Sequence, residues 1–112
     1  MKALINKTSK VAYFLWDDST VITLKEDLIE VGNPLEYRIT DQNSLTCEVV
    51  TGVTEPTKFK PGKYQYKNNE WVDNVPTDDG RTYTWTDEGG GYWSWEDEAN
   101  NPPTEQYRAL YP

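Results

Sequence analysis

The most constraining feature of this 112-residue chain is the uneven distribution of its aliphatic side chains. Residues 1–53 contain sixteen Ile, Leu and Val residues, and only three more follow them. The first half can therefore bury an aliphatic core, whereas the second half has to rely on aromatic rings. At this length the chain has room for one ordinary domain. We expect a β-rich core domain over residues 1–73, followed by an aromatic-rich extension over residues 74–112.

The first half has the pattern of short strands separated by turns. Turn residues such as Asp17-Asp18-Ser19 and Gly32-Asn33-Pro34 interrupt apolar runs at a spacing typical of antiparallel sheets. The predicted strands are Ala3–Lys7, Val11–Trp16, Thr20–Leu24, Leu28–Val31, Leu35–Thr40 and Leu45–Thr51. This pattern predicts an all-β fold, in the form of a small antiparallel β-sandwich or barrel with an extended aromatic-rich C-terminal hairpin or arm.

The predicted strand Val11–Trp16 is apolar on both faces. If its side chains alternate strictly, the faces are formed by Val11, Tyr13 and Leu15 and by Ala12, Phe14 and Trp16. A strand of this type is usually covered on both sides. The single cysteine, Cys47, lies in another apolar run, and we expect it to be a small buried side chain.

Residues 63–72 read as a tight hairpin. Asn tolerates a positive φ, so Asn68-Asn69 can form a two-residue type I′ turn. That register places Lys67 opposite Glu70 and Tyr66 opposite Trp71. We expect an ion pair from the first two residues and an aromatic pair from the second two.

A second aromatic hairpin is predicted over residues 82–95, around a run of three glycines. Folding this segment about Gly89 places Trp85 opposite Trp93 and Tyr83 opposite Trp95. Four such rings carry roughly 600–1000 Å² of surface to bury, which is comparable to one side of a standard protein interface at about 800 Å². Either this ribbon covers the domain's own core or it binds another subunit. The candidate partner-binding residues are Tyr83, Trp85, Trp93, Trp95, Tyr107 and Tyr111.

The charge of the chain is as uneven as its hydrophobicity. Its net charge is -8, and residues 68–112 hold ten acidic and two basic side chains, whereas residues 1–67 hold nine of each. Such an extension repels phosphate backbones, so we expect no nucleic-acid partner and instead a basic protein surface. No segment approaches the ~18 consecutive apolar residues of a membrane helix, and we expect no membrane partner.

The residue types that most often carry catalysis or bind metals are scarce. Histidine is absent and there is one cysteine, which leaves no ligand set for zinc. No phosphate-binding loop, nucleophile elbow or dinucleotide motif occurs. Paired carboxylates such as Asp78-Asp79 are typical of solvated turns. We therefore expect no catalytic residue, no cofactor and no enzymatic activity.

Two segments resemble small virion proteins of tailed bacteriophages of marine bacteria and cyanobacteria. The first comprises Met1-Lys2-Ala3-Leu4-Ile5, Lys10-Val11-Ala12-Tyr13 and Ser19-Thr20-Val21-Ile22-Thr23-Leu24, and the second runs from Pro56 through Pro61-Gly62-Lys63-Tyr64-Gln65-Tyr66 to Trp71. The resemblance covers residues 1–73. It implies a non-enzymatic subunit of a tail, fibre, baseplate or capsid lattice, made in the host cytoplasm and bound to other virion subunits in multiple copies.

Two other functions remain open from the residues alone. A carbohydrate-recognition module for a host surface glycan would stack sugar rings on Trp85, Trp93 and Trp95, with Asp87 and Glu88 binding hydroxyl groups. A small regulatory protein would use its acidic half to mimic nucleic acid.

Overall fold

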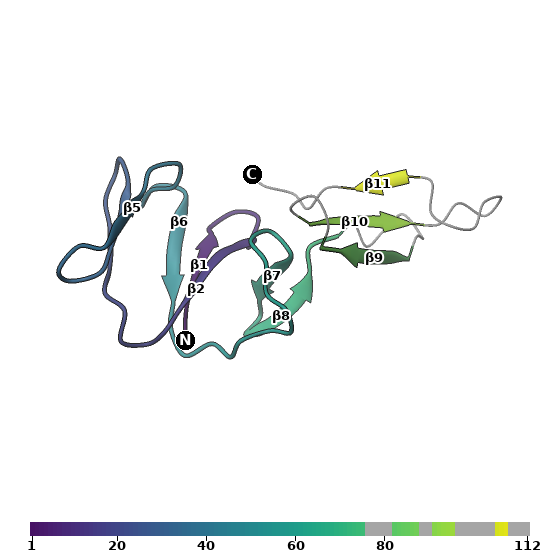
Figure 1. Ribbon diagram of the computed structural model, residues 1–112, viewed down its shortest axis with the longest axis horizontal. Coiled ribbons are helices and arrows are strands. Elements are labelled where there is room, and N and C mark those ends of the chain that lie inside the picture. The colour runs from purple at the N-terminus through teal and green to yellow at the C-terminus, as the bar shows by residue number, and fades with distance from the viewer. Residues whose placement is uncertain (76–81, 88–90, 96–104, 108–112) are drawn as a thin grey trace.

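The computed structural model describes residues 1–75, 82–87, 91–95 and 105–107, the last of these by backbone alone. In these ranges the regular structure consists of β-strands in small antiparallel sheets (Figure 1). The predicted all-β, antiparallel fold is therefore confirmed. Within the same ranges, no helix is long and apolar enough to span a bilayer.

The six strands predicted in the first half all occur: the first is shifted by one residue towards the N-terminus, and the other five are shorter than predicted by one to three residues. The first sheet, in the order β2-β1-β6, contains β1 (Lys2–Asn6), β2 (Ala12–Trp16) and β6 (Cys47–Val50). The second, in the order β3-β4-β5, contains β3 (Ile22–Leu24), β4 (Ile29–Val31) and β5 (Tyr37–Ile39).

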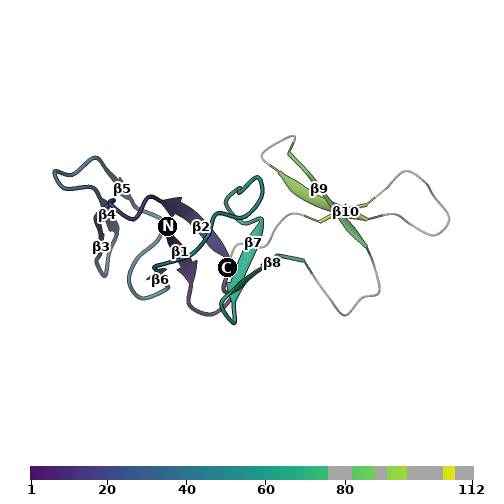
Figure 2. The same cartoon turned by 90° about the horizontal axis from the view of Figure 1, so that it is seen from below.

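The aromatic segments form the remaining sheets. One is the hairpin of β7 (Tyr64–Lys67) and β8 (Glu70–Asp73). The other, in the order β11-β10-β9, contains β9 (Tyr83–Thr86), β10 (Tyr92–Trp95) and β11 (Glu105–Tyr107). We call this last one the aromatic sheet. Figures 1 and 2 show β3-β4-β5 at one end of the elongated molecule and the aromatic sheet at the other.

The first sheet lies at the centre of the core because both of its faces are covered. Leu4 and Val11 belong to a cluster that reaches β4 and β5, whereas Ile5 and Ala12 belong to a second cluster on the opposite face. Val53 and partly buried rings of the β7–β8 hairpin complete that second cluster. The expectation that Val11–Trp16 is covered on both sides is confirmed.

The predicted alternation along this strand is wrong after Tyr13. Leu4 pairs with Phe14, but the next residue of β1, Ile5, pairs with Ala12, so Tyr13 is an extra residue in a β-bulge. The bulge shifts the alternation by one residue. Phe14 and Trp16 therefore join the cluster of Val11 and Tyr13, whereas Leu15 joins that of Ala12. The rings of Phe14 and Trp16 stack with centroids 5.5 Å apart and planes 4° apart.

The β3-β4-β5 sheet has one apolar face and one charged face. Ile22, Val31 and Tyr37 lie opposite one another in register, and Trp16 donates a 2.8 Å hydrogen bond from Nε1 to the Tyr37 hydroxyl. On the other face Arg38 lies opposite Glu30, whose carboxylate forms ion pairs of 3.6 Å with Arg38 and 2.9 Å with Lys25. This alternation is what places the sheet against the core.

Cys47 is fully buried, as expected. Its thiol donates a hydrogen bond to Oε1 of Gln42 at 3.1 Å. Burial raises the pKa of the thiol, while the hydrogen bond from Thr46 and the charge of Lys7 act in the opposite direction. The neutral side chain is part of the core on the β4 side of the first sheet.

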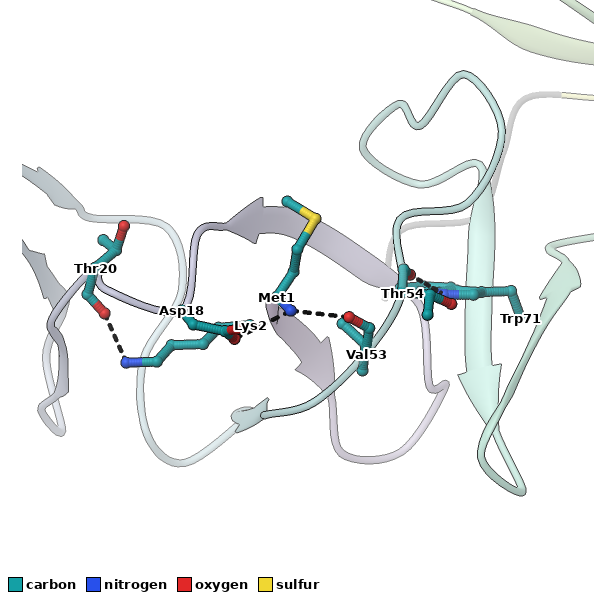
Figure 3. A network of polar contacts seen from close by, with 7 residues as sticks. All are labelled: Met1, Lys2, Asp18, Thr20, Val53, Thr54 and Trp71. Carbon is teal, nitrogen blue, oxygen red and sulfur yellow. Dashed lines mark hydrogen bonds and ion pairs between the residues drawn. The ribbon is translucent and has the colours of Figure 1, made fainter.

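Polar contacts tie the start of β1 to the connector that precedes the aromatic hairpins (Figure 3). The Met1 ammonium donates to the Val53 carbonyl at 2.8 Å and pairs with Asp18 at 3.0 Å, and the Val53 amide donates back to the Met1 carbonyl at 3.1 Å. One residue further on, the Thr54 carbonyl accepts a 2.7 Å hydrogen bond from Trp71 Nε1. The β7–β8 hairpin is therefore anchored to the first sheet.

Candidate functional site

The β7–β8 hairpin forms with the predicted turn and register. Asn68 and Asn69 have φ values of 54° and 62°, as a type I′ turn requires. Tyr66 lies opposite Trp71 with ring centroids 4.7 Å apart, so the predicted aromatic pair is present. Lys67 also lies opposite Glu70, but no ion pair joins these two described residues, and that expectation is wrong. Both side chains are exposed, where water solvates them and ordering them in one geometry gains little.

Trp71 is held on several sides by its own chain. The rings of Phe59 and Tyr64 approach it edge-on at 6.4 and 6.1 Å, in addition to Tyr66. Its indole N–H is satisfied by the Thr54 carbonyl. Tyr64 in turn donates its hydroxyl to the Thr57 carbonyl at 2.7 Å. The predicted pair of Tyr66 and Trp71 is therefore present, and both rings are partly buried against the core cluster on that face of the first sheet.

The aromatic sheet confirms the register predicted for residues 82–95. Trp85 lies opposite Trp93 with centroids 5.1 Å apart, and Tyr83 lies opposite Trp95 at 5.7 Å. Because opposed residues share a face and alternate residues along a strand do too, all four rings lie on one face of the β9–β10 pair. Both pairs are edge-to-face, with planes 69° and 64° apart.

The four rings of this face differ in burial. Trp93 is 4% exposed, whereas Tyr83, Trp85 and Trp95 are each only partly buried. The indole N–H of Trp85 donates to the Asp87 carboxylate at 2.6 Å. The indole N–H of Trp93 is buried and has no hydrogen-bond partner among the residues that the structure describes. One predicted site residue is therefore inside the chain's own fold, and three retain surface for contact.

Gly91 allows Trp85 to take its position. Its φ is +88°, and a Cβ built there would overlap Cζ2 of the Trp85 ring. The indole therefore lies directly against the backbone at Gly91. Any larger residue would have to displace this ring as well as adopt a strained conformation. The sequence predicts only a turn at the glycine run, because local spacing does not indicate that a ring packs against the backbone there.

A buried lysine joins the two aromatic hairpins. Lys63 is 7% exposed, and its ammonium lies 5.3 Å from the centroid of Tyr64 and 5.4 Å from that of Trp85. It also donates to the Lys58 carbonyl at 3.2 Å. A cation in this position is attracted to both ring faces. Buried Asn74 fixes the segment around Lys63. Its side chain donates a 2.9 Å hydrogen bond from Nδ2 to the Gly62 carbonyl, and its backbone N–H donates to the Lys63 carbonyl at 3.1 Å.

The remaining predicted site residues are only partly placed. Tyr107 pairs in register with Trp93 through the β10–β11 ladder, and its side chain is not described. Tyr111 and Glu88 lie outside the described residues. In the part of the chain that the structure describes, no three His, Cys, Asp or Glu side chains gather as metal ligands would. The described part of this site presents partly exposed aromatic rings on one face of the β9–β10 pair.

Comparison with known proteins does not assign the chain to a family. No family model, curated protein or solved structure matched the chain.

Proposed function

We propose that this chain is a non-enzymatic structural subunit of a bacteriophage particle, in a tail, fibre, baseplate or capsid-decorating position. It binds neighbouring virion subunits through the ring-bearing face of the aromatic sheet. The proposal is supported by the resemblance of residues 1–73 to small virion proteins and by the residue types present at the site. Its location is accordingly the virion.

The observation that carries the proposal is the partial exposure of Tyr83, Trp85 and Trp95 on one face, beside fully packed Trp93. Edge-to-face contacts hold these rings in place before any partner arrives. Rigid aromatic side chains lose little conformational entropy on binding, which is why Trp and Tyr are enriched among residues that dominate interface energies.

The geometry favours a protein partner over a sugar. A sugar ring stacks on a flat, accessible ring face. The ring planes of both pairs instead lie 64° or more apart, the Trp85 ring packs against the backbone at Gly91, and Trp93 is buried. An irregular ring surface of this kind is complementary to apolar protein side chains.

The test is incorporation into particles. The source virus is engineered to encode Tyr83→Ser/Trp95→Ser, with Leu45→Ser as the control because Leu45 is 68% exposed and outside the aromatic sheet. Antibody labelling and mass spectrometry of purified particles measure the amount of the chain. We expect the unmodified and control chains in many copies and the double variant at least about tenfold lower, as expected when two central contact residues are lost. A chain found only in the soluble fraction of the lysate would refute the role, as would normal incorporation of the double variant.

A further inference from the structure

The ring-bearing face of the aromatic sheet is contacted by a side chain from outside the sheet. The Lys63 ammonium lies over the Trp85 ring, 5.4 Å from its centroid, and Trp85 is one of the rings on that face. Lys63 directly precedes β7, which Figures 1 and 2 show between the first sheet and the aromatic sheet. The chain therefore covers part of its own proposed contact surface.

The backbone of Lys63 is held by the core side of this contact. Its amide donates to the Lys60 carbonyl at 3.0 Å, and its carbonyl accepts a 3.1 Å hydrogen bond from the Asn74 amide. The amide of the preceding residue, Gly62, donates to the Ala12 carbonyl of β2 at 2.9 Å. Because the backbone is fixed in this way, the part of Lys63 that can leave the Trp85 ring is its flexible side chain.

The ammonium of Lys63 is incompletely satisfied where it lies. An ammonium has three N–H donors, and its one hydrogen bond to a described residue, the carbonyl of Lys58, is 3.2 Å long. No carboxylate in the described part of the chain lies within ion-pairing distance of it, and Lys63 is 7% exposed. Burial of a charge without a paired carboxylate is unfavourable. The attraction to the rings of Tyr64 and Trp85 offsets part of that cost.

An ammonium in this position makes the contact with the ring easy to open. An apolar side chain that leaves a ring exposes apolar surface to water, which is unfavourable. When the Lys63 side chain leaves Trp85, its ammonium instead recovers hydration, and this gain compensates for the lost attraction to the ring. The same movement uncovers the Trp85 ring for another side chain.

We propose that Lys63 makes an autoinhibitory contact with the ring-bearing face. In the free chain Lys63 covers the Trp85 ring, and an apolar side chain of the neighbouring subunit replaces it there when the two bind. This inference rests on the proposed role of the aromatic sheet as a binding face and adds a step to it. Lys63 thereby raises the specificity of binding, because a partner has to interact with the Trp85 ring more favourably than Lys63 does.

Labelling of the full chain with 5-fluorotryptophan tests the cover directly. Each indole then has its own ¹⁹F resonance, and Trp85→Phe identifies that of Trp85. In Lys63→Ala we expect a soluble paramagnetic probe to broaden the Trp85 resonance more than in the unmodified chain, while the Trp93 resonance stays protected. The matched control, Lys60→Ala, removes the same charge from an exposed side chain of the same connector and leaves the Trp85 resonance unchanged. An equal response of Trp85 in all three chains overturns the inference.

Binding to particles tests the competition between Lys63 and the partner. The probe is particles purified from the source virus after deletion of the gene for this chain. We expect Lys63→Ala to bind them with a dissociation constant about fivefold lower than the unmodified chain, because the partner no longer displaces a cation from the ring. Lys60→Ala binds like the unmodified chain. Lys63→Arg binds more weakly, because a guanidinium also stacks on the aromatic ring that it covers.

The same measurement separates this inference from the proposed function. Tighter binding of Lys63→Ala cannot result from misfolding, so this variant stays informative even if its stability falls. If Lys63→Ala binds no more tightly than the unmodified chain while Tyr83→Ser/Trp95→Ser fails to bind, the virion role stands and the autoinhibitory contact is refuted. If no chain binds the particles, the proposed function fails and the inference that rests on it fails with it.

Discussion

The two aromatic hairpins of this chain both place aromatic rings opposite each other on antiparallel strands. They differ in what the rest of the chain packs around those rings. In the β7–β8 hairpin Trp71 is surrounded by Phe59, Tyr64 and Tyr66, and its indole N–H is bonded to a carbonyl of the preceding connector. In the aromatic sheet Trp93 is buried with an unbonded N–H, and Trp95 keeps exposed surface. The comparison teaches that two similar ring pairs acquire different surroundings from the rest of the chain, and the pair left with fewer described partners is the one that we propose as a contact surface.

Trp71→Ala should have the largest effect on stability. It removes a ring that contacts three others and leaves the Thr54 carbonyl without its donor, so we expect a loss of about 3 kcal/mol. Chemical denaturation followed by far-UV circular dichroism measures it. Trp95→Ala is the matched variant from the other hairpin and should cost less than about 1 kcal/mol, since this ring retains exposed surface. Equal losses in the two variants would remove the distinction between the hairpins.

Gly91→Ala tests whether close approach to the backbone organises the aromatic sheet. The added methyl overlaps the Trp85 ring and φ is positive, so we expect a local destabilisation of about 2 kcal/mol. Amide exchange should show it as lost protection at Trp85 and Trp93, with β1 and β2 unchanged. The control is Gly52→Ala, where φ is also positive but nothing lies within 4 Å of the new methyl. An unchanged sheet in the first variant would show that the ring does not depend on Gly91.

Lys63→Met should weaken the connection between the hairpins while keeping the length of the side chain. Loss of the cation between Tyr64 and Trp85 should cost about 1 kcal/mol. A double-mutant cycle with Trp85→Leu isolates the interaction, and the coupling energy should be favourable. If the stability losses of Lys63→Met and Trp85→Leu are additive, the Lys63 ammonium and the Trp85 ring do not interact favourably.

Alkaline pH should lower the stability of the β7–β8 hairpin through Tyr64. Burial, followed by the negative charge of Asp73, raises the pKa of its phenol in the folded state. The folded state thus favours the neutral phenol, and the associated stability is complete below the unfolded pKa of 10.0 and is lost as the pH rises through the folded value. Denaturation midpoints between about pH 8 and 11 should fall less for Tyr64→Phe than for the unmodified chain. Parallel profiles would contradict this.

The smallest effect is expected at the β7–β8 turn. Because Lys67 and Glu70 form no ion pair, Lys67→Ala and Glu70→Ala should each change stability by no more than about 0.5 kcal/mol, and their effects should add. Thermal unfolding of the two single variants and the double variant measures this. A coupling above about 0.5 kcal/mol would show that the pair forms in solution.

Local patterns predicted most of the secondary structure and both aromatic registers. The Asn68-Asn69 turn fixes the pairing of β7 with β8 over a few residues, and the spacing of the aromatic residues predicted the pairing of β9 with β10. The bulge at Tyr13 could not be foreseen, because an apolar strand looks the same with either alternation. Nor could the contact between Lys63 and Trp85, which depends on how two hairpins meet. The burial of Trp93 beside partly exposed Trp95 likewise follows from tertiary packing.

The buried indole N–H of Trp93 has a practical consequence. A hydrogen-bond donor removed from water and left without an acceptor is destabilised by about 1–3 kcal/mol, and any oxygen brought within reach would recover that energy. An indole in this state is also a built-in spectroscopic gauge, because its proton resonance and its emission respond to the arrival of an acceptor. Opening of the sheet, entry of a water molecule and engagement of a partner could each be followed at this one nitrogen.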